Sequence, residues 1–211
     1  MKHLLTLAFL LVSWSASAQT TPPPSLYDVT GVAADDVLNI RTAPAAAAEQ
    51  IGALPHDATG VEVVALSENT RWGMVNHEGV AGWVSMTYLA STGGPEWWEM
   101  ATPLFCYGTE PFWNVTFDPS GTSQLERMGE APVDLAFDWI TPAWGNPDWD
   151  RPYSVAMTVS GGGQSGIGVL RAESCNDGMS DQEFALRLQI FMQTGQSAPA
   201  DYGGCCTMAP N

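Results

Sequence analysis

The chain has a single lysine and few histidines, and both shortages limit what it can catalyse. The lysine is Lys2, and the three histidines are His3, His56 and His77. Without further lysines, the chain has no residue for Ser-Lys hydrolysis, Schiff-base chemistry or a phosphate-binding NTPase loop. Without histidine in its second half, it lacks the base of a Cys-His peptidase and the histidine ligands of a zinc amidase. We therefore expect a protein that is not an enzyme.

Positive charge is scarce as well. Six arginines accompany Lys2 against 23 acidic residues, and the formal net charge is −16 at pH 7. Such a surface repels the phosphates of nucleic acids and anionic membrane surfaces, so we expect no nucleic-acid partner. A plainer explanation of the acidity is solubility, because net charge keeps proteins soluble without determining their fold.

Long apolar runs are missing from the chain after its first residues. No later segment has the roughly 20 consecutive apolar residues of a membrane span. The run Leu4–Trp14 is apolar but too short to cross a bilayer, and Ala16–Ala18 supplies a small-x-small cleavage signal. We interpret residues 1–18 as a signal peptide. The remaining chain is expected to be periplasmic or secreted, with no membrane span.

Cysteine is absent from the first half and concentrated in the second. The four cysteines are Cys106, Cys175, Cys205 and Cys206. In an exported protein they are expected to be oxidised. A bond between the adjacent Cys205 and Cys206 would be strained, because linked Cα atoms usually lie about 4.4–6.8 Å apart. We therefore expect Cys106 and Cys175 to pair separately with the two tail cysteines, each bond being worth roughly 2–4 kcal/mol.

What the chain has in abundance is short alternation broken by turn residues. From Val37 to Leu89, apolar alternations are interrupted about every 8–12 positions, which is typical of a small β-barrel. Asn76–Gly79 suits a hairpin turn with Gly79 at positive φ. Alternation continues in five segments of the second half: Phe112–Phe117, Val133–Trp139, Tyr153–Val159, Gly166–Ala172 and Phe184–Met192. No stretch has a helical period, so the sequence predicts an all-β protein with two antiparallel barrels.

Composition divides the chain into successive parts. These are the signal peptide at 1–18, a proline-rich leader at 19–26, a first domain at 27–90, a linker at 91–101 and a second domain at 102–211. Ser91–Pro95 reads as a linker by composition. Trp97 and Trp98 follow it and are expected to dock the two domains, because paired tryptophans rarely stay exposed. The prolines and Gly145 between Ile140 and Pro152 predict a loop or an edge elaboration there.

The first domain carries a pattern spread over its whole length. It opens with DVLNIRTAP at Asp36–Pro44, continues through RWGMV at Arg71–Val75 and GVAGWV at Gly79–Val84, and ends at Tyr88 and Leu89. This pattern resembles the bacterial SH3 domain, a family found in envelope and cell-wall proteins. The resemblance implies an SH3-like barrel that binds peptidoglycan or peptide segments.

Five residues of this domain are candidates for ligand binding. Trp72, Trp83 and Tyr88 supply flat, rigid surface at low entropic cost. Asn39 and Arg41 flank a strand end, from which an amide and a guanidinium could reach a ligand. The alternative place for the tryptophans is the barrel core, which such side chains commonly fill. The alternative for Arg41 is a hydrogen-bond anchor for a loop.

Three motifs mark the second domain. They are CYGTEPFW at 106–113, CNDGMSD at 175–181 and GCC at 204–206. Together they resemble a family of uncharacterised bacterial envelope proteins, over residues 104–207. The resemblance implies a disulfide between Cys175 and Cys205 or Cys206, which leaves the other for Cys106. It implies a compartment and an architecture but no activity. More loosely, the domain is similar in size and disulfides to the flattened β-barrels of periplasmic lysozyme inhibitors.

The candidate site residues of the second domain are Glu110, Trp113, Asp177, Ser180 and Asp181. A carboxylic acid paired with a carboxylate can cleave a glycan, so Glu110 and Asp177 carry the enzymatic alternative. Their other explanation is structural, because such residues before proline and glycine stabilise turns. Asp177 with Asp181 has the oxygen ligands that calcium uses, as do Asp148 and Asp150, but neither pair has the spacing of a known calcium loop. We expect no metal and no cofactor.

These observations predict a non-catalytic exported binding protein of the cell envelope. Its expected partner is a cell-wall glycopeptide or an envelope protein, recognised by the first domain. Two alternatives stand beside this prediction: a carboxylate-dependent glycan hydrolase, and an inhibitor of lytic enzymes built on the second domain.

Overall fold

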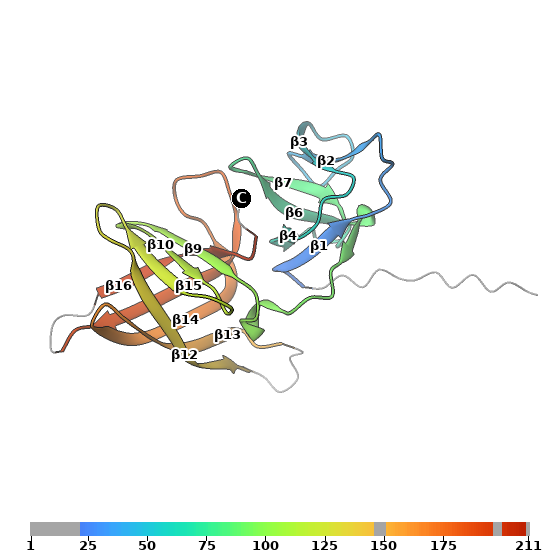
Figure 1. Ribbon diagram of the computed structural model, residues 1–211. Helices are drawn as coiled ribbons and strands as arrows, with labels where there is room; N and C mark the ends of the chain where they lie inside the picture. Colours follow the sequence, from blue (N-terminus) through green and yellow to red (C-terminus); the bar gives the residue numbers. More distant parts are fainter. Residues whose placement is uncertain (1–21, 146–150, 196–199, 210–211) are drawn as a thin grey trace, which may run out of the picture.

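The computed structural model describes residues 22–145, 151–195 and 200–209, and these fold almost entirely into β-strands. Figure 1 shows two units side by side, which we call the amino-terminal module (residues 25–91) and the barrel (residues 104–207). The predicted all-β class is confirmed. Across the part of the chain that is described, no helix is long and apolar enough to cross a membrane. The predicted signal peptide at 1–18 lies outside the described residues.

The module consists of a three-stranded sheet in the order β4-β1-β8 and a five-stranded sheet in the order β3-β2-β7-β6-β5. Its elements are β1 (Ser25–Val29), β2 (Val37–Arg41), β3 (Gln50–Pro55), β4 (Val61–Val63), β5 (Ala65–Leu66), β6 (Trp72–His77), β7 (Val80–Ser85), the 3-10 turn η1 (Met86–Tyr88) and β8 (Leu89–Ser91). The β6–β7 hairpin turns at Glu78 and Gly79, with φ of 48° and 86°. The predicted positive φ at Gly79 is confirmed.

The first strand begins earlier than the sequence suggests and belongs to both units. β1 starts at Ser25, inside the expected leader, and pairs with β4 and β8. Tyr27 and Val29 are buried in the core of the module, while Leu26, on the opposite face, packs against the core of the barrel. Because side chains alternate along a strand, this single strand presents one face to each unit.

The barrel is a closed meander of eight antiparallel strands in which β16 returns to pair with β9. Its strands are β9 (Leu104–Thr109), β10 (Phe112–Phe117), β11 (Ser123–Arg127), β12 (Val133–Ala143), β13 (Ser154–Gly161), β14 (Gln164–Cys175), β15 (Phe184–Gln193) and β16 (Ala200–Thr207). A disulfide between Cys106 and Cys206 joins directly opposed residues of β9 and β16, inside the core. The bond therefore staples the seam at which the barrel closes.

A second disulfide lies outside the barrel wall. Cys175 at the end of β14 reaches across the start of β15 to Cys205 of β16. The two sulfur-bearing residues form a small buried cluster with Phe184, against which Tyr107 packs. Cys205 and Cys206 are adjacent in a strand and point to opposite faces, which is why each finds a different partner. Cys106 and Cys175 are thus each bonded to one of the two adjacent tail cysteines, as predicted.

The linker contributes to both units. The 3-10 turn η2 (Trp97–Glu99) places Trp97 in the core of the barrel, and Trp98 meets it edge to face with ring centroids 5.7 Å apart. The predicted loop after Ile140 begins later than expected, because β12 continues to Ala143. Pro142 is tolerated there because the pairing of β12 with β11 involves only Val133–Leu135, so no neighbour on that side needs its missing N–H.

Candidate functional site

A groove of about 570 Å³ lies on the outer face of the five-stranded sheet. Strand β7 runs between β2 and β6, so Arg41 pairs with Trp83 and Ser85 pairs with Trp72. Gly82 and Val84 are the alternate residues of β7 and face inward, which leaves Trp83 and Ser85 on the outer face. The groove is lined by Gly31, Val32, Ala33, Asp36, Val37, Leu38, Asn39, Arg41, Ala46, Arg71, Trp72, Ser85, Thr87 and Tyr88.

Most of the predicted ligand residues meet in this groove. Asn39, Arg41, Trp72 and Tyr88 all line it, although they come from β2, β6 and η1. Tyr88 is 41% exposed, and Trp72 is half-buried. Trp83 shares the outer face but does not line the groove, and its half-buried ring sits beside Arg41 and Met74 in the strand register. Trp83 is therefore neither fully buried in the core nor part of the groove lining.

Arg41 combines the two roles that the sequence left open. Its Nη1 donates a hydrogen bond to the carbonyl oxygen of Ala48 at 2.8 Å, so it anchors the loop between β2 and β3. It also lines the groove, together with Arg71, which sequence reasoning missed. Arg71 stands beside Trp72 in the chain, and that adjacency was the available signal. Within the described residues, neither guanidinium forms an ion pair.

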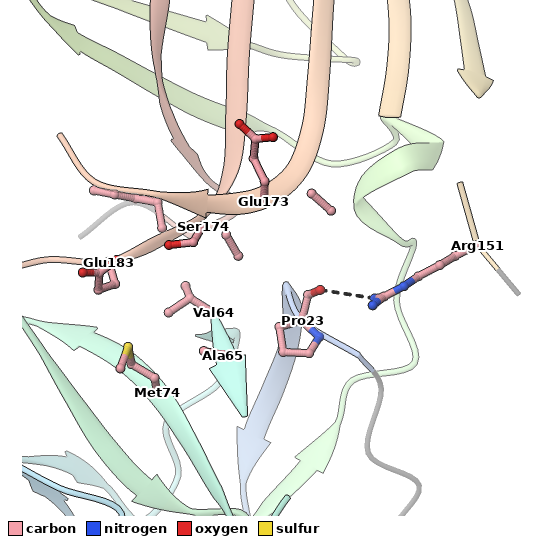
Figure 2. A pocket seen from close by; sticks show the side chains of 11 residues that line it. Pro23, Val64, Ala65, Met74, Arg151, Glu173, Ser174 and Glu183 are labelled. Atoms are coloured by element: carbon pink, nitrogen blue, oxygen red, sulfur yellow. Dashed lines mark hydrogen bonds between the residues drawn. The ribbon is translucent and has the colours of Figure 1, made fainter. Parts of the chain in front are cut away.

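A second cavity, of about 450 Å³, lies between the two units (Figure 2). Val64, Ala65 and Met74 of the module lie opposite Ser174 of β14, whereas the carboxylate of the neighbouring lining residue Glu173 points away from the module. The remaining lining residues are Pro23, Arg151, Ala172, Glu183, Phe184 and Ala185. Sequence reasoning did not single out this interdomain cleft, because its walls come from segments far apart in the chain.

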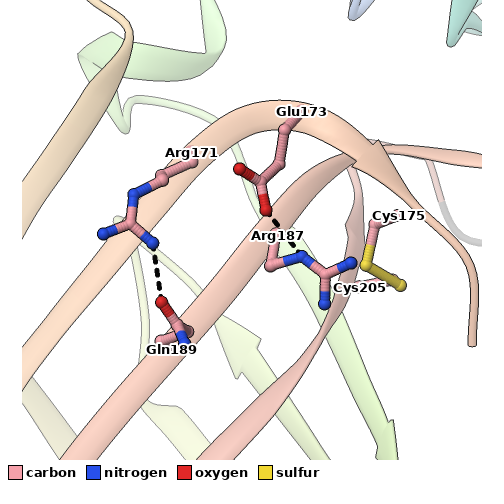
Figure 3. Close-up of polar contacts among 6 residues, drawn as sticks. All are labelled: Arg171, Glu173, Cys175, Arg187, Gln189 and Cys205. Atoms are coloured by element: carbon pink, nitrogen blue, oxygen red, sulfur yellow. Dashed lines mark hydrogen bonds and ion pairs between the residues drawn. A yellow bond between two sulfur atoms is a disulfide. The ribbon is translucent and has the colours of Figure 1, made fainter.

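Two of the charged side chains that line the cleft, Glu173 and Arg151, have polar partners. Glu173 forms an ion pair with Arg187, with Oε1 2.6 Å from Nε (Figure 3). Arg151 donates to the carbonyl oxygen of Pro23 at 3.2 Å and so ties the barrel to the segment before β1 (Figure 2). Beside the Glu173–Arg187 ion pair, on the outer wall of the barrel, Arg171 donates a hydrogen bond to Oε1 of Gln189 at 2.6 Å (Figure 3). These contacts stabilise the barrel surface and the joint between the units.

The CNDGMSD motif folds into a loop that holds its own carboxylate. Oδ1 of Asp177 accepts hydrogen bonds from the backbone N–H groups of Met179 and Ser180, both at 2.9 Å, and Oδ2 accepts from the Ser180 hydroxyl at 2.8 Å. Burial works to raise the pKa of Asp177, but these hydrogen bonds outweigh it and hold the pKa below its ordinary value. The Thr109 hydroxyl donates to the Asp177 carbonyl oxygen at 3.1 Å. The carboxylate of Asp177 therefore stabilises its own turn, which is the structural explanation given above.

The same loop docks on the module. The backbone N–H of Ala81 donates to the carbonyl oxygen of Asp181 at 2.8 Å, and Val80 and Asp181 form a parallel β-bridge. The Asn76 amide donates to the carbonyl oxygen of Glu183 at 2.8 Å and accepts from its N–H at 3.1 Å. The side chain of Asn76 thus imitates a neighbouring strand. Asp181, which the sequence marked as a candidate site residue, thus contributes its backbone to the joint between the units.

The other two candidate residues of the second domain are separated from each other. Trp113 is buried in the core of the barrel, edge to face with Tyr202, and its ring covers the space above Gly108, where an added Cβ would lie 2.0 Å from Nε1. Glu110 is exposed at the turn between β9 and β10. Neither Glu110 nor Asp177 lines the groove or the interdomain cleft.

One buried carboxyl lies at the joint. Glu62 of β4 is 8% exposed, and its Oε2 is hydrogen-bonded to the hydroxyl of Thr207 from the barrel. Burial raises the pKa of Glu62 from its ordinary value to about 7; the Thr207 hydroxyl and the nearby backbone N–H groups of Met208 and Ala209 lower it by less. Burial and the negative charge of Glu62 also raise the pKa of Tyr107.

Proton counting explains why the neutral form suits this place. The oxygen of the Thr207 hydroxyl is within hydrogen-bond distance of both Glu62 and the carbonyl oxygen of Ala209, the latter at 2.7 Å. A hydroxyl has only one proton to donate. When Glu62 is protonated, it donates to Thr207, and Thr207 donates to Ala209. When Glu62 is ionised, its carboxylate and the carbonyl oxygen of Ala209 both require the single proton of the Thr207 hydroxyl.

Comparison with known proteins adds no assignment: no protein-family model matches the chain, and no curated protein or solved structure shows significant similarity to it. Among the described residues, no group of three or more His, Cys, Asp or Glu side chains is placed to hold a metal ion. Asp148 and Asp150 lie outside the described residues.

Proposed function

We propose that the protein is a non-catalytic, exported binding protein of the cell envelope, whose amino-terminal module holds a peptide segment of the cell wall in its groove. The observation that carries this proposal is the convergence of Trp72, Tyr88, Asn39 and Arg41 on one open groove. These residues come from three separate elements, so their meeting depends on the fold and not on proximity in the chain.

The composition of the groove suits a peptide. Aromatic rings give contact area at little cost in side-chain entropy, and amide, hydroxyl and guanidinium groups orient polar backbone. Its volume of about 570 Å³ falls within the range of roughly 300–1,000 Å³ that ligand sites usually have. The barrel, by contrast, is packed throughout its core and serves as a stapled scaffold against which the module is fixed.

The test is retention of the chain from residue 19 onward on purified, insoluble peptidoglycan. Trp72→Ala removes the half-buried ring of the groove and is expected to lower the affinity about tenfold or more, as loss of an aromatic hot spot does. The matched control is Trp144→Ala, which removes a ring that is 54% exposed on the barrel and should leave retention unchanged.

Two results would contradict the proposal. One is no retention of the unmodified protein, and the other is full retention after Trp72→Ala. Clearing of cell-wall material by the intact chain in a zymogram would replace a binding role with the hydrolase alternative, and Glu110→Gln would then show whether that carboxyl takes part.

A further inference from the structure

The arginines of the module are confined to its groove. Between residues 27 and 90 the chain has two arginines, Arg41 and Arg71, and both line the groove. The same stretch contains eight acidic residues, which are Asp28, Asp35, Asp36, Glu49, Asp57, Glu62, Glu68 and Glu78. Of these acids, only Asp36 lines the groove. In a protein with a net charge of −16, the groove is therefore a local concentration of positive charge.

Both guanidinium-bearing residues line the same groove from neighbouring parts of the sheet. Arg41 ends β2, and Arg71 immediately precedes β6, with β7 running between these strands. The bond from Arg41 Nη1 to Ala48 fixes that side chain and leaves its other N–H donors for a ligand. Arg71 is exposed, and among the described residues it forms no ion pair. Trp72 lies next to it and supplies the adjoining flat surface.

The acidic lining residue is partly engaged by its own backbone. Oδ1 of Asp36 accepts a hydrogen bond from the N–H of Val37 at 2.8 Å. Its carboxylate repels an anion that comes close to it, so it restricts where an anionic group can settle. A carboxylate in the groove gains most on the side of Arg71 and Arg41.

We propose that the groove selects a ligand by a peptide carboxylate, which is bound by Arg71 and Arg41 while the adjoining residue of the peptide rests on Trp72 and Tyr88. This inference rests on the proposed function and names the group that the site recognises. Guanidinium matches a carboxylate with paired N–H donors, and such charge-assisted hydrogen bonds are the strong ones. The acidic surface elsewhere repels anions, so a carboxylate that approaches the protein is favoured at this groove alone among the described surfaces of the module.

The direct test uses two probes that differ in one group. They are an N-acetylated tri-alanine peptide with a free carboxyl terminus, and the same peptide as its carboxamide. Binding is followed by the indole N–H signals of the intact chain in heteronuclear NMR. We expect the free-carboxyl peptide to shift the Trp72 signal and to bind about two- to fivefold more tightly than the carboxamide, the range that exposed charge pairs give. Equal binding of the two peptides, or binding of neither up to millimolar concentration, overturns the inference.

The variants separate a groove contact from a general charge effect. Arg71→Gln should remove most of the preference for the free-carboxyl peptide, and added salt should weaken that preference in the unmodified protein. Arg171→Gln changes the net charge by the same amount on the wall of the barrel and should leave the preference intact. A preference that survives Arg71→Gln, or that falls equally in both variants, contradicts a carboxylate site at the groove.

A final arm distinguishes this inference from the proposed function. Peptidoglycan whose carboxyl groups have been converted to amides is compared with untreated peptidoglycan. Weaker retention on the amidated material supports both statements. Equal retention on both, lost in Trp72→Ala, leaves the proposed function standing and overturns the carboxylate inference. No retention on either, with the free-carboxyl peptide still preferred, overturns the cell-wall proposal and keeps the carboxylate site.

Discussion

The two units solve the problem of sheet edges in opposite ways. The barrel pairs every strand with two neighbours and fastens the closing pair, β9 and β16, with the Cys106–Cys206 disulfide. The module ends its two sheets at β4, β8, β3 and β5 and contains no cysteine. A closed barrel has no edge strand, whereas an open sheet leaves one face and its edge strands accessible. The contrast agrees with the proposal that the barrel contributes stability and the module binds the ligand.

The largest loss of stability is expected when the Cys106–Cys206 disulfide between β9 and β16 is removed. Cys106→Ala with Cys206→Ala opens a link between residues 100 positions apart, whereas Cys175→Ala with Cys205→Ala opens one of 30. By loop entropy, the first pair should cost about 4–5 kcal/mol and the second about 1 kcal/mol less. Urea unfolding of both double variants measures the difference. A larger loss for the outer disulfide would contradict the view that the seam disulfide contributes more to the stability of the barrel.

The next test concerns a ring that enters the barrel from outside its strands. Trp97 is 1% exposed and belongs to the barrel core, although it lies in the linker. Trp97→Ala should destabilise the protein by about 3–5 kcal/mol, as large-to-small changes in cores do. Trp98→Ala is the matched control, since that ring is only half-buried, and should cost clearly less. Similar losses for the two would show that the linker merely covers the barrel.

The joint between the units should respond to pH through Glu62. Its folded pKa of about 7 exceeds its ordinary value of 4.5, so the folded state binds more protons than the unfolded state between these values. The free energy of unfolding therefore falls as pH rises from about 4.5 to 7, by on the order of 3 kcal/mol from this group. Below 4.5 the contribution is constant and most favourable.

Glu62→Gln keeps the shape and removes the titration. The variant should be more stable than the unmodified protein at pH 8, and this advantage should vanish as pH falls through the window to 4.5. Urea midpoints at several pH values give the difference directly, which cancels the titration of other acids. A difference that does not depend on pH would contradict a neutral Glu62 at the joint.

The smallest expected effect concerns Asn76, whose side chain clamps the backbone of Glu183. Asn76→Ala removes two hydrogen bonds at the joint and should cost about 1–2 kcal/mol. Hydrogen exchange is expected to accelerate at residues 176–183 but not in the barrel core. Acceleration throughout the barrel would mean that the two units unfold as one, which would weaken the distinction between them.

Strand positions were largely predictable from alternation. The expected segment Phe112–Phe117 is β10 itself, and Phe184–Met192 lies within β15. The expected segments did not include β9, β11 or β16, and the glycines and cysteines of β16 do not alternate in hydrophobicity. Gly204 is needed there for packing, since an added Cβ would lie 2.0 Å from the carbonyl oxygen of Tyr107.

The groove was predictable in part, and the joint was not. Trp72 and Tyr88 could be chosen because aromatic residues in a small β-domain are recognisable from sequence alone. Trp83 looked the same and does not line the groove, because only the register of β2, β7 and β6 decides which ring borders the cavity. Asp177 looked like a site residue, but its partners are local backbone N–H groups. Contacts between distant segments leave no local pattern in the chain.

We propose that ligand binds in the groove of the module and not on the barrel or in the interdomain cleft. Titration of the intact chain with soluble peptidoglycan fragments, followed by two-dimensional NMR, tests this most directly. We expect shifts of the signals of Arg71, Trp72 and Tyr88, and no shift of the signals of Glu173 and Glu183. Shifts confined to the cleft or the barrel, or no shifts at all, would contradict it.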